Sequence, residues 1–347
     1  MGRPGALARA TNPIRRPGKE HAVTSWPIYR GTGEPHDGIT RLPPPPPWRA
    51  FAGGPALRPP EIADDEEHRR LGVTRATTYR GDPEEVQLIN SALLLRRPLL
   101  VTGKPGTGKS TLAYAIAHEL GLGPVLRWSI TSRSTLLHGL YQYDAIRRVE
   151  DASLSRTEPA DIGNYLRLGP LGTAVLPYEK PRVLLIDELD KGDIDLPNDL
   201  LILLEEGEFE IPELSRLAAR TARVQTIERD WVDVHDGLVR CRAFPVIVIT
   251  SNGEREFPPA FLRRCVRLAL APPGADRLAR IVEAHLGSDT AATSADIVER
   301  FLSRAQHGDL ATDQLLNAIY VNLYAAQGND VGRSELTDLI LQHLSAG

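Results

Sequence analysis

The chain has 347 residues, of which 41% are hydrophobic and 25% charged, and its formal net charge is -4. A chain of this length can bury a sizeable core and has room for about two domains. The small net charge gives no overall field that favours nucleic acid, and no run of about 18 uncharged apolar residues predicts a membrane span. Cys241 and Cys265 lack the spacing of a metal site or a disulfide framework, so we expect packed thiols in a cytoplasmic protein.

The first part of the chain, residues 1–75, is rich in proline, glycine and arginine. It lacks the apolar stretch of a signal peptide, so export is not expected. The consecutive prolines Pro43–Pro47 predict a polyproline II rod. Such a rod serves either as a docking ligand or as a stiff linker, and the composition favours the linker. We therefore predict a largely disordered N-terminal segment.

Five short apolar runs alternate with helical patterns between residues 76 and 270. In chain order they read "PLLVT", "VLRWSIT", "RVLLIDE", "FPVIVITSN" and "VRLAL". Strands separated by helices are typical of a parallel sheet that is covered on both faces. Residues 76–270 are therefore predicted to form a three-layer α/β domain with a parallel five-stranded sheet.

After residue 270 the strand-like runs stop. Amphipathic helical patterns cover residues 276–286, 293–306, 312–327 and 334–344. Several of these segments begin with serine, threonine or aspartate, which cap helix N-termini. We predict a small all-helical domain over residues 271–347.

The stretch "LLVTGKPGTGKST" enters a glycine-rich loop that matches G-x-x-x-x-G-K-[ST]. A strand precedes the loop and a helical pattern follows it, as this phosphate-binding motif requires. Glycines let backbone N–H groups surround phosphate oxygens, the lysine brings charge to the terminal phosphates, and the serine hydroxyl binds Mg²⁺. ATP and Mg²⁺ are the expected cofactors. The predicted binding residues are Gly103, Lys104, Pro105, Gly106, Thr107, Gly108, Lys109, Ser110 and Thr111.

A second motif, "RVLLIDELDK", places Asp187 and Glu188 at the end of an apolar strand. Acidic strand ends are common in proteins, but a phosphate loop needs a metal-binding acid on a neighbouring strand. Asp187 is therefore predicted to bind Mg²⁺ together with Ser110, and Glu188 to act as general base on the attacking water. Asp190 and Lys191 are expected at the surface or at a subunit contact.

Asn252 directly follows the run "FPVIVITSN", where its amide can orient the lytic water or contact the γ-phosphate. Arg263 and Arg264 follow a short helical pattern that begins at proline. An arginine there can complete the active site of a neighbouring subunit, because a guanidinium stabilises charge that develops on the γ-phosphoryl group. The predicted catalytic residues are thus Glu188, Asn252, Arg264 and Arg263.

Together these motifs resemble those of the AAA+ ATPases, and in particular of their MoxR branch. The resemblance spans about residues 76 to 345, with Walker A at Gly103–Ser110, Walker B at Val183–Glu188, sensor 1 at Asn252, an arginine finger at Arg264 or Arg263, and a helical lid. The segment "LRLGPLGTAVLPYEKPRVLLIDELDKGDIDLPNDLLILLEEGEFEIPEL" looks like the approach to Walker B of the MoxR branch, followed by a helix and a hairpin.

The resemblance implies an insert within residues 136–169, a hairpin before sensor 1, and oligomeric rings, as hexamers, that use ATP to remodel a protein partner. In this branch that partner is often a von Willebrand type A domain protein encoded nearby. The strings "RGTGEPHDGITRLPPPPPWR" and "TSRSTLLHGLYQYDAI" look like a subset from bacterial multi-gene conflict or defence systems. One feature departs from the family: the segment expected to carry the sensor 2 arginine begins "GDLATDQLLNAIY", with Asp313 and no basic residue in its first turn, and Arg333 comes too late.

Three functions are compatible with these motifs. The first is an ATP-hydrolysing ring that remodels a partner, which the complete set of Asp187, Glu188, Asn252 and Arg264 favours. The second is a nucleotide-gated scaffold or switch with little turnover, which the missing sensor 2 arginine favours. The third is a P-loop kinase or DNA-loading ATPase, for which the sequence offers no basic groove or distinct lid chemistry.

Overall fold

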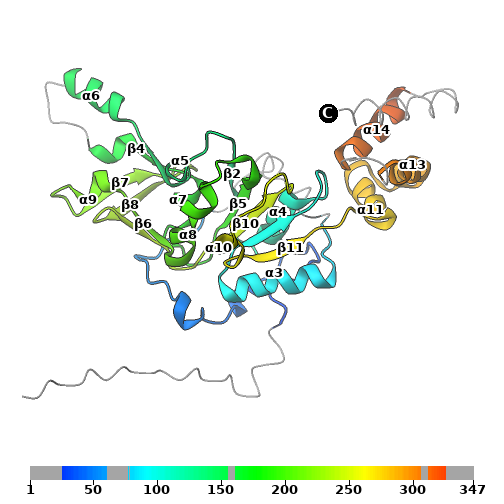
Figure 1. Ribbon diagram of the computed structural model, residues 1–347, viewed down its shortest axis with the longest axis horizontal. Coiled ribbons are helices and arrows are strands. Elements are labelled where there is room, and N and C mark those ends of the chain that lie inside the picture. The colour runs from blue at the N-terminus through cyan, green and yellow to red at the C-terminus, as the bar shows by residue number, and fades with distance from the viewer. Residues whose placement is uncertain (1–25, 61–76, 78, 155–160, 306–311, 326–347) are drawn as a thin grey trace, which may run out of the picture.

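The computed structural model describes residues 26–60, 77, 79–154, 161–305 and 312–325. At its centre lies a sheet of five parallel strands in the order β11-β1-β10-β5-β2 (Figure 1). The strands are β1 (Leu99–Thr102), β2 (Leu126–Ser129), β5 (Val183–Asp187), β10 (Val246–Ser251) and β11 (Val266–Ala269). Each strand lies within one of the five predicted apolar runs. The predicted α/β fold with a parallel five-stranded sheet is therefore confirmed.

Burial along the strands follows their position in the sheet. The interior strand β5 is buried at every residue, whereas the edge strand β2 beside it alternates between buried and exposed side chains. In β5, Leu184 and Ile186 join the hydrophobic cluster on one face of the sheet, and Val183 and Leu185 join the cluster on the other. Successive side chains of a strand point to opposite faces, so a strand covered on both sides must be apolar throughout.

Helices cover both faces of this sheet. On one face α3 (Pro83–Leu95) and α4 (Lys109–Glu119) pack in one cluster, and on the other α7 (Pro170–Ala174) and α8 (Leu196–Glu206) pack in the second cluster. A capping box formed by Asp82 and Glu85 begins α3, and Gly207 in the left-handed conformation ends α8. The result is the three-layer arrangement that the sequence predicts.

A second sheet of six strands, in the order β3-β4-β7-β8-β9-β6, extends from one end of the domain (Figure 1). Its strands are β3 (Tyr141–Tyr143), β4 (Leu166–Leu168), β6 (Glu208–Glu210), β7 (Thr221–Gln225), β8 (Trp231–His235) and β9 (Leu238–Arg240). The remaining elements at this end are α5 (Leu136–Leu140), α6 (Ala145–Leu154), η3 (Ile162–Tyr165) and α9 (Pro212–Ser215). The expected insert lies between α5 and α7, and the expected hairpin is β7–β8. Strand β4 of the insert pairs with strand β7 of the hairpin, so the insert and the hairpin belong to one sheet, which the sequence does not predict.

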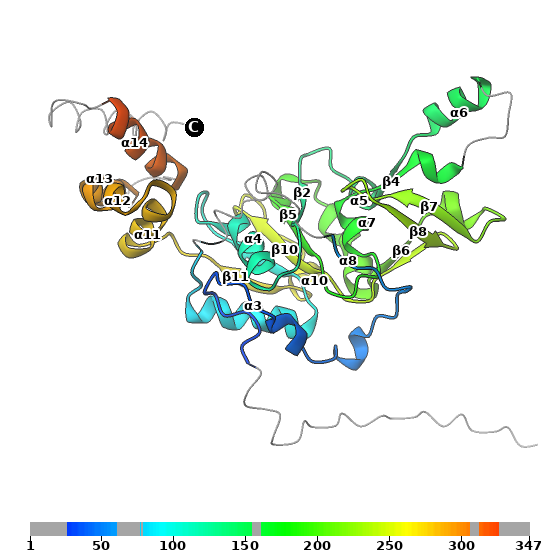
Figure 2. The ribbon, with the colours of Figure 1, turned by 180° about the vertical axis from the view of Figure 1, so that it is seen from behind.

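Residues 26–60, which we call the N-terminal strap, lie against the α/β domain (Figure 2). The strap contains η1 (Gly38–Arg41) and η2 (Pro47–Arg49), and its side chains Ile28 and Tyr29 are buried in the cluster that also holds α3 and α4. The prediction of disorder is therefore wrong for residues 26–60, because these apolar groups enter the core. Residues 1–25 and 61–76 lie outside the described part of the chain.

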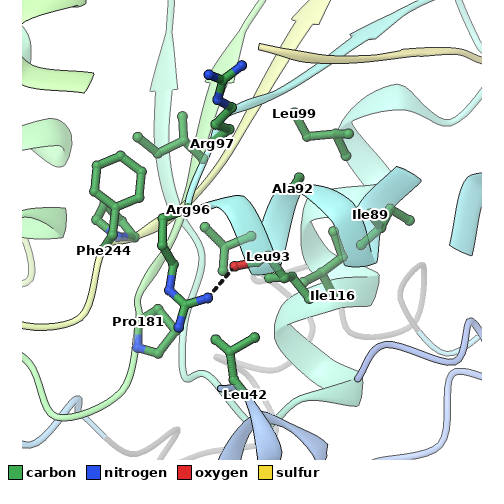
Figure 3. A pocket seen from close by; sticks show the side chains of 13 residues that line it. Leu42, Ile89, Ala92, Leu93, Arg96, Arg97, Leu99, Ile116, Pro181 and Phe244 are labelled. Carbon is green, nitrogen blue, oxygen red and sulfur yellow. Dashed lines mark hydrogen bonds between the residues drawn. The ribbon is translucent and has the colours of Figure 1, made fainter. Parts of the chain in front are cut away.

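A buried carboxylate holds the start of the strap. Glu119, at the end of α4, accepts hydrogen bonds from the backbone N–H groups of residues 30–33 at 2.5–3.1 Å, and its side chain is fully buried. Leu42 of the strap borders a small apolar cavity of about 20 Å³ between α3, α4 and Phe244 (Figure 3). This cavity is barely large enough for one water, so it belongs to the packed core and not to a ligand site.

Beyond β11 the described chain is helical. The elements are α11 (Ala275–Leu286), α12 (Ser288–Thr293), α13 (Ala295–Ala305) and α14 (Thr312–Ala325), and they enclose a hydrophobic cluster of their own. Figure 1 shows this helical group standing beside the α/β domain. The predicted helical segment 334–344 lies outside the described residues.

Two further expectations concern single features of the chain. Cys241 and Cys265 are both buried free thiols, and burial raises the pKa of each to about 12, as expected for packed groups. Among the described residues no helix has the length and hydropathy needed to cross a membrane.

Candidate nucleotide-binding site

The glycine-rich loop connects β1 to α4 and has the backbone geometry of a phosphate loop. Gly106 and Gly108 have φ angles of 75° and 91°, which L side chains rarely adopt. A Cβ at Gly103 would lie 2.7 Å from the carbonyl oxygen of Leu270, so no larger residue fits there. The first N–H groups of α4 and its positive dipole end face the loop, which makes this end of the helix suited to an anion.

The side chain of Lys109 folds back over the glycine-rich loop and contacts its first residues. Its ammonium donates hydrogen bonds to the carbonyl oxygens of Gly103 at 2.7 Å and Lys104 at 2.8 Å. Burial lowers the pKa of Lys109, while the nearby carboxylates of Asp190, Glu188 and Asp187 act in the opposite direction. A buried cation that forms no ion pair with a carboxylate of the described residues can bind phosphate oxygens strongly.

Asp187 ends β5 directly beside the loop. One of its oxygens accepts hydrogen bonds from the Ser110 hydroxyl at 2.7 Å and the Thr250 hydroxyl at 2.8 Å, and the other accepts from the Arg127 guanidinium at 2.7 Å. Burial raises the pKa of Asp187, but these three hydrogen bonds outweigh burial and hold the pKa below its ordinary value. Asp187 is therefore a carboxylate at neutral pH.

The donor set beside the loop fits Mg²⁺. Ser110 and Asp187 offer a hydroxyl and a carboxylate oxygen in contact with each other, and these hard oxygen donors are the ones that Mg²⁺ prefers. No cluster of three or more His, Cys, Asp or Glu side chains that could hold a metal occurs in the described chain. A magnesium ion that keeps several waters and shares phosphate oxygens needs only one or two protein ligands.

Glu188 and Asn252 lie in direct contact. The Asn252 amide donates to one oxygen of Glu188 at 3.2 Å, and the Lys191 ammonium donates to the other at 2.8 Å. The Glu188 N–H donates to the same Thr250 hydroxyl that binds Asp187. The two side chains to which the sequence assigns water orientation and proton transfer are therefore hydrogen-bonded to each other.

Asp190 does not lie at the surface. It is only 3% exposed, and one of its carboxylate oxygens accepts the backbone N–H groups of Asn252 at 2.9 Å and Glu254 at 3.1 Å. The expectation for Asp190 is wrong, because this acid satisfies the N–H groups that β10 leaves unpaired where it ends. Lys191 is exposed, in agreement with the expectation.

These residues line a cleft of about 630 Å³ between the α/β domain and the C-terminal helices. Pro105 to Thr111, Asp187, Glu188 and Asn252 all line it, whereas Gly103 and Lys104 of the same loop do not. The volume is typical of a small-molecule site, for which about 300–1,000 Å³ is common.

Arg263 and Arg264 do not lie in the cleft. They follow α10 (Pro259–Leu262) and precede β11, at the edge of the sheet where the parallel strands begin. The phosphate loop follows the opposite end of β1, and a strand of four residues separates the two edges by more than about 10 Å. Neither arginine lines the cleft of its own chain, so a role of the doublet in hydrolysis would have to be exerted on another subunit.

Sequence reasoning missed several residues that line the cleft. Arg127 stands on β2, and Tyr79, Arg277 and Arg280 approach from outside the motifs. Arg277, on α11, pairs with Glu85 at 3.3 Å and lies over the Tyr79 ring. The only signal in the sequence is an arginine within an apolar strand pattern, "VLRWSIT", and a basic pair in the first helix after residue 270.

The helical group also contacts the loop directly. The Thr312 hydroxyl, at the start of α14, donates to the Gly106 carbonyl oxygen at 2.7 Å, and Asp313 lines the cleft. Arg280 is exposed, lines the same cleft, and has no hydrogen-bond or ion-pair partner among the described residues. Arg280 on α11 therefore brings a cation to this cleft, whereas α14 carries no lysine or arginine.

Comparison with known families agrees with this geometry. Residues 98–265 match the family model described as AAA domain (dynein-related subfamily). The matched segment begins just before β1 and ends just before β11, so it contains the phosphate loop, Asp187, Glu188, Asn252 and the arginine doublet. This match fits a P-loop ATPase of the AAA+ type.

Proposed function

We propose that this chain is a MoxR-like AAA+ ATPase that hydrolyses ATP within a ring of identical subunits and uses the energy to remodel or activate a partner protein. The observation that supports this best is the division of the predicted residues between two edges of one sheet. Ser110, Asp187, Glu188 and Asn252 meet at the carboxyl edge, and the arginine doublet lies at the opposite edge. AAA proteins generally form oligomeric rings, in which such a division lets one subunit complete the site of the next.

The proposed chemistry assigns one task to each group. The phosphate loop and Lys109 bind the β- and γ-phosphates. Ser110 and Asp187 would hold Mg²⁺, which when bound neutralises charge on those phosphates. Asn252 orients a water, Glu188 accepts its proton as the oxygen attacks the γ-phosphorus, and a neighbour's Arg264 or Arg263 stabilises the charge of the transition state.

The finer assignment rests on the sequence resemblance. It includes a hexameric ring, a cytoplasmic location, a von Willebrand type A domain protein as partner, and a place in a bacterial multi-gene system. No membrane association and no nucleic acid are proposed. Capture with the Glu188→Gln protein, which should hold ATP and its partner without turnover, tests the partner assignment.

Two substitutions test the site itself. Lys109→Ala should abolish ATP binding, because the loop loses its cation, and near-normal affinity would exclude this site. Glu188→Gln should bind ATP with unchanged affinity and lose turnover, since Asp187 is retained and only the base is removed. Unchanged hydrolysis in Glu188→Gln would mean that the base lies elsewhere.

The shared active site is tested by mixing subunits. Arg264→Ala should bind ATP normally and lose turnover by about 10³-fold or more. Mixing it with Lys109→Ala should restore part of the activity, because an intact loop from one variant then meets an intact arginine from the other. Flat activity across all mixing ratios, with mixed oligomers confirmed by mass, would reject the shared site.

A second candidate function is a nucleotide-gated scaffold with little turnover. Asp313 faces the cleft where family members carry a sensor 2 arginine, and Lys191 pairs with Glu188. Both features would slow hydrolysis. Turnover measured against protein concentration separates the two functions: an ATPase ring gains activity as it assembles, whereas a scaffold assembles with ATP and stays slow.

A further inference from the structure

Arg49 of the N-terminal strap is a buried charge, only 9% exposed. Its guanidinium lies over the Phe244 ring, 4.8 Å from the centroid. One guanidinium nitrogen donates hydrogen bonds to the carbonyl oxygens of Leu204 at 2.7 Å and Glu205 at 3.1 Å, and a second donates to the Arg96 carbonyl oxygen. A single side chain therefore ties together the last turn of α8 and the residue that follows α3.

The contact with α8 provides hydrogen-bond donors for carbonyl groups at the end of this helix. The last carbonyl groups of a helix have no partner within the helix and carry its negative dipole end. Arg49 supplies both hydrogen bonds and positive charge at this end of α8. Without them the last turn of α8, which carries Glu205, would open more readily.

Both segments that Arg49 contacts, the end of α8 and the residue after α3, are next to residues that bind the arginine doublet. Glu205 forms an ion pair with the Nε group of Arg264, and the Arg264 Nη1 group donates to the Ala260 carbonyl oxygen at 3.0 Å. On the other side Arg97, next to Arg96, donates from its guanidinium to the carbonyl oxygen of Arg263 at 2.9 Å.

The ion pair also orients the guanidinium of Arg264. With Nε and Nη1 engaged, Nη2 is the nitrogen of Arg264 that has no partner among the described residues. A guanidinium fixed on two sides presents this third nitrogen in one direction. Such preorganisation matters for a group that must meet developing charge in another subunit, because a displacement of about 1 Å can cost about 100-fold in rate.

We propose that Arg49 is a positioning residue for the arginine finger: the N-terminal strap fixes Arg264, through the end of α8 and Glu205, and the backbone of Arg263, through Arg96 and Arg97. This inference rests on the proposed function, because it assumes that the doublet acts on a neighbouring subunit. In this arrangement the strap influences ATP turnover at the neighbouring subunit, and the phosphate loop of its own subunit is unaffected.

Subunit mixing tests the inference. Arg49→Met keeps an unbranched apolar side chain at this buried position and removes the guanidinium. We expect ATP affinity within about twofold of the unmodified protein and turnover lowered by at least about tenfold. Mixed with Lys109→Ala, which has an intact finger, Arg49→Met should recover activity. Mixed with Arg264→Ala, it should not, since neither partner then supplies a positioned finger. Arg147→Met, on the exposed α6, is the matched control and should behave as the unmodified protein.

A purely structural role of Arg49 predicts a different pattern. If Arg49→Met merely destabilised the subunit, its ATP affinity would fall. Mixing with Lys109→Ala or with Arg264→Ala would then change its activity equally, and that result would overturn the inference. If Arg49→Met does not fold, Glu205→Gln gives the same test, because it removes only the ion pair with Arg264 at a half-exposed position. Full turnover in Glu205→Gln would also overturn it. Failure of Arg264→Ala and Lys109→Ala to complement each other would instead reject the shared site itself.

Discussion

At the scale of single residues, the cations of the cleft differ in how far they are already engaged. Arg127 binds Asp187, and Arg277 is neutralised by Glu85, whereas Arg280 has no partner among the described residues. A negatively charged nucleotide entering this cleft also meets Asp313. We therefore expect the guanidinium of Arg280 to bind the terminal phosphate of the nucleotide.

Arg280→Ala should affect the binding of ATP more than that of ADP. The affinity for ATP should fall by about tenfold, the value expected for one lost charge-assisted hydrogen bond, and the affinity for ADP should change much less. Fluorescent ATP and ADP analogues measure both constants. Arg280→Lys should retain most of the ATP preference, and equal losses for ATP and ADP would contradict the assignment to the terminal phosphate.

At the scale of elements, buried hydrogen bonds add to apolar burial in holding the start of the strap. Glu119 accepts four backbone N–H groups and the His36 ring, and Asn90 on α3 accepts the N–H groups of Ile28 and Tyr29 at 2.8 and 2.9 Å. Polar groups buried in this way stabilise the segment only while every partner is present, because an unsatisfied buried donor is costly.

Glu119→Gln should therefore release the start of the strap. The amide keeps the shape of the carboxylate but turns one acceptor into a donor that faces backbone N–H groups. We expect the free energy of unfolding to fall by about 2 kcal/mol or more, measured by urea denaturation. Glu210→Gln, at an exposed position of β6, is the control and should change it by less than about 0.5 kcal/mol. Similar values for both variants would show that the strap does not depend on Glu119.

At the scale of the whole molecule, the α/β domain and the C-terminal helices have separate cores. Prominent polar contacts between them are the Arg277–Glu85 pair and the hydrogen bond from Thr312 to Gly106. Both contacts border the cleft, so nucleotide binding and the position of the helices are expected to depend on each other.

Arg277→Ala should uncouple the two parts. Each core remains intact, but α11 loses its contacts with Glu85 and the Tyr79 ring. We expect faster hydrogen exchange in α11 and α14, unchanged exchange in β5 and β10, and weaker ATP binding. Unchanged exchange in α11 would mean that packing alone fixes the helices. Arg300→Ala, on α13 away from the cleft, serves as the comparison.

The amino-acid sequence by itself determines the central sheet and the nucleotide motifs. The five strands lie within the predicted runs because burial on both faces requires continuous apolar residues, which a local pattern reveals. The glycine-rich loop and the acids at the end of β5 are equally local, since each needs only its own strand and the element that follows. For the same reason the placement of Asn252 beside Glu188 could be predicted, as parallel strands end at one edge.

Only the tertiary structure decides the rest. The strap orders because Ile28, Glu119 and Arg49 find partners far away in the chain, and nothing in a proline-rich composition indicates those contacts. The burial of Asp190 and the arrival of Arg280 in the cleft depend likewise on loops and helices that meet only after folding. The six-stranded sheet forms because β4 and β7 pair across a long stretch of sequence. Such contacts leave no periodic signal, because their energy comes from the partner and not from the neighbouring residues.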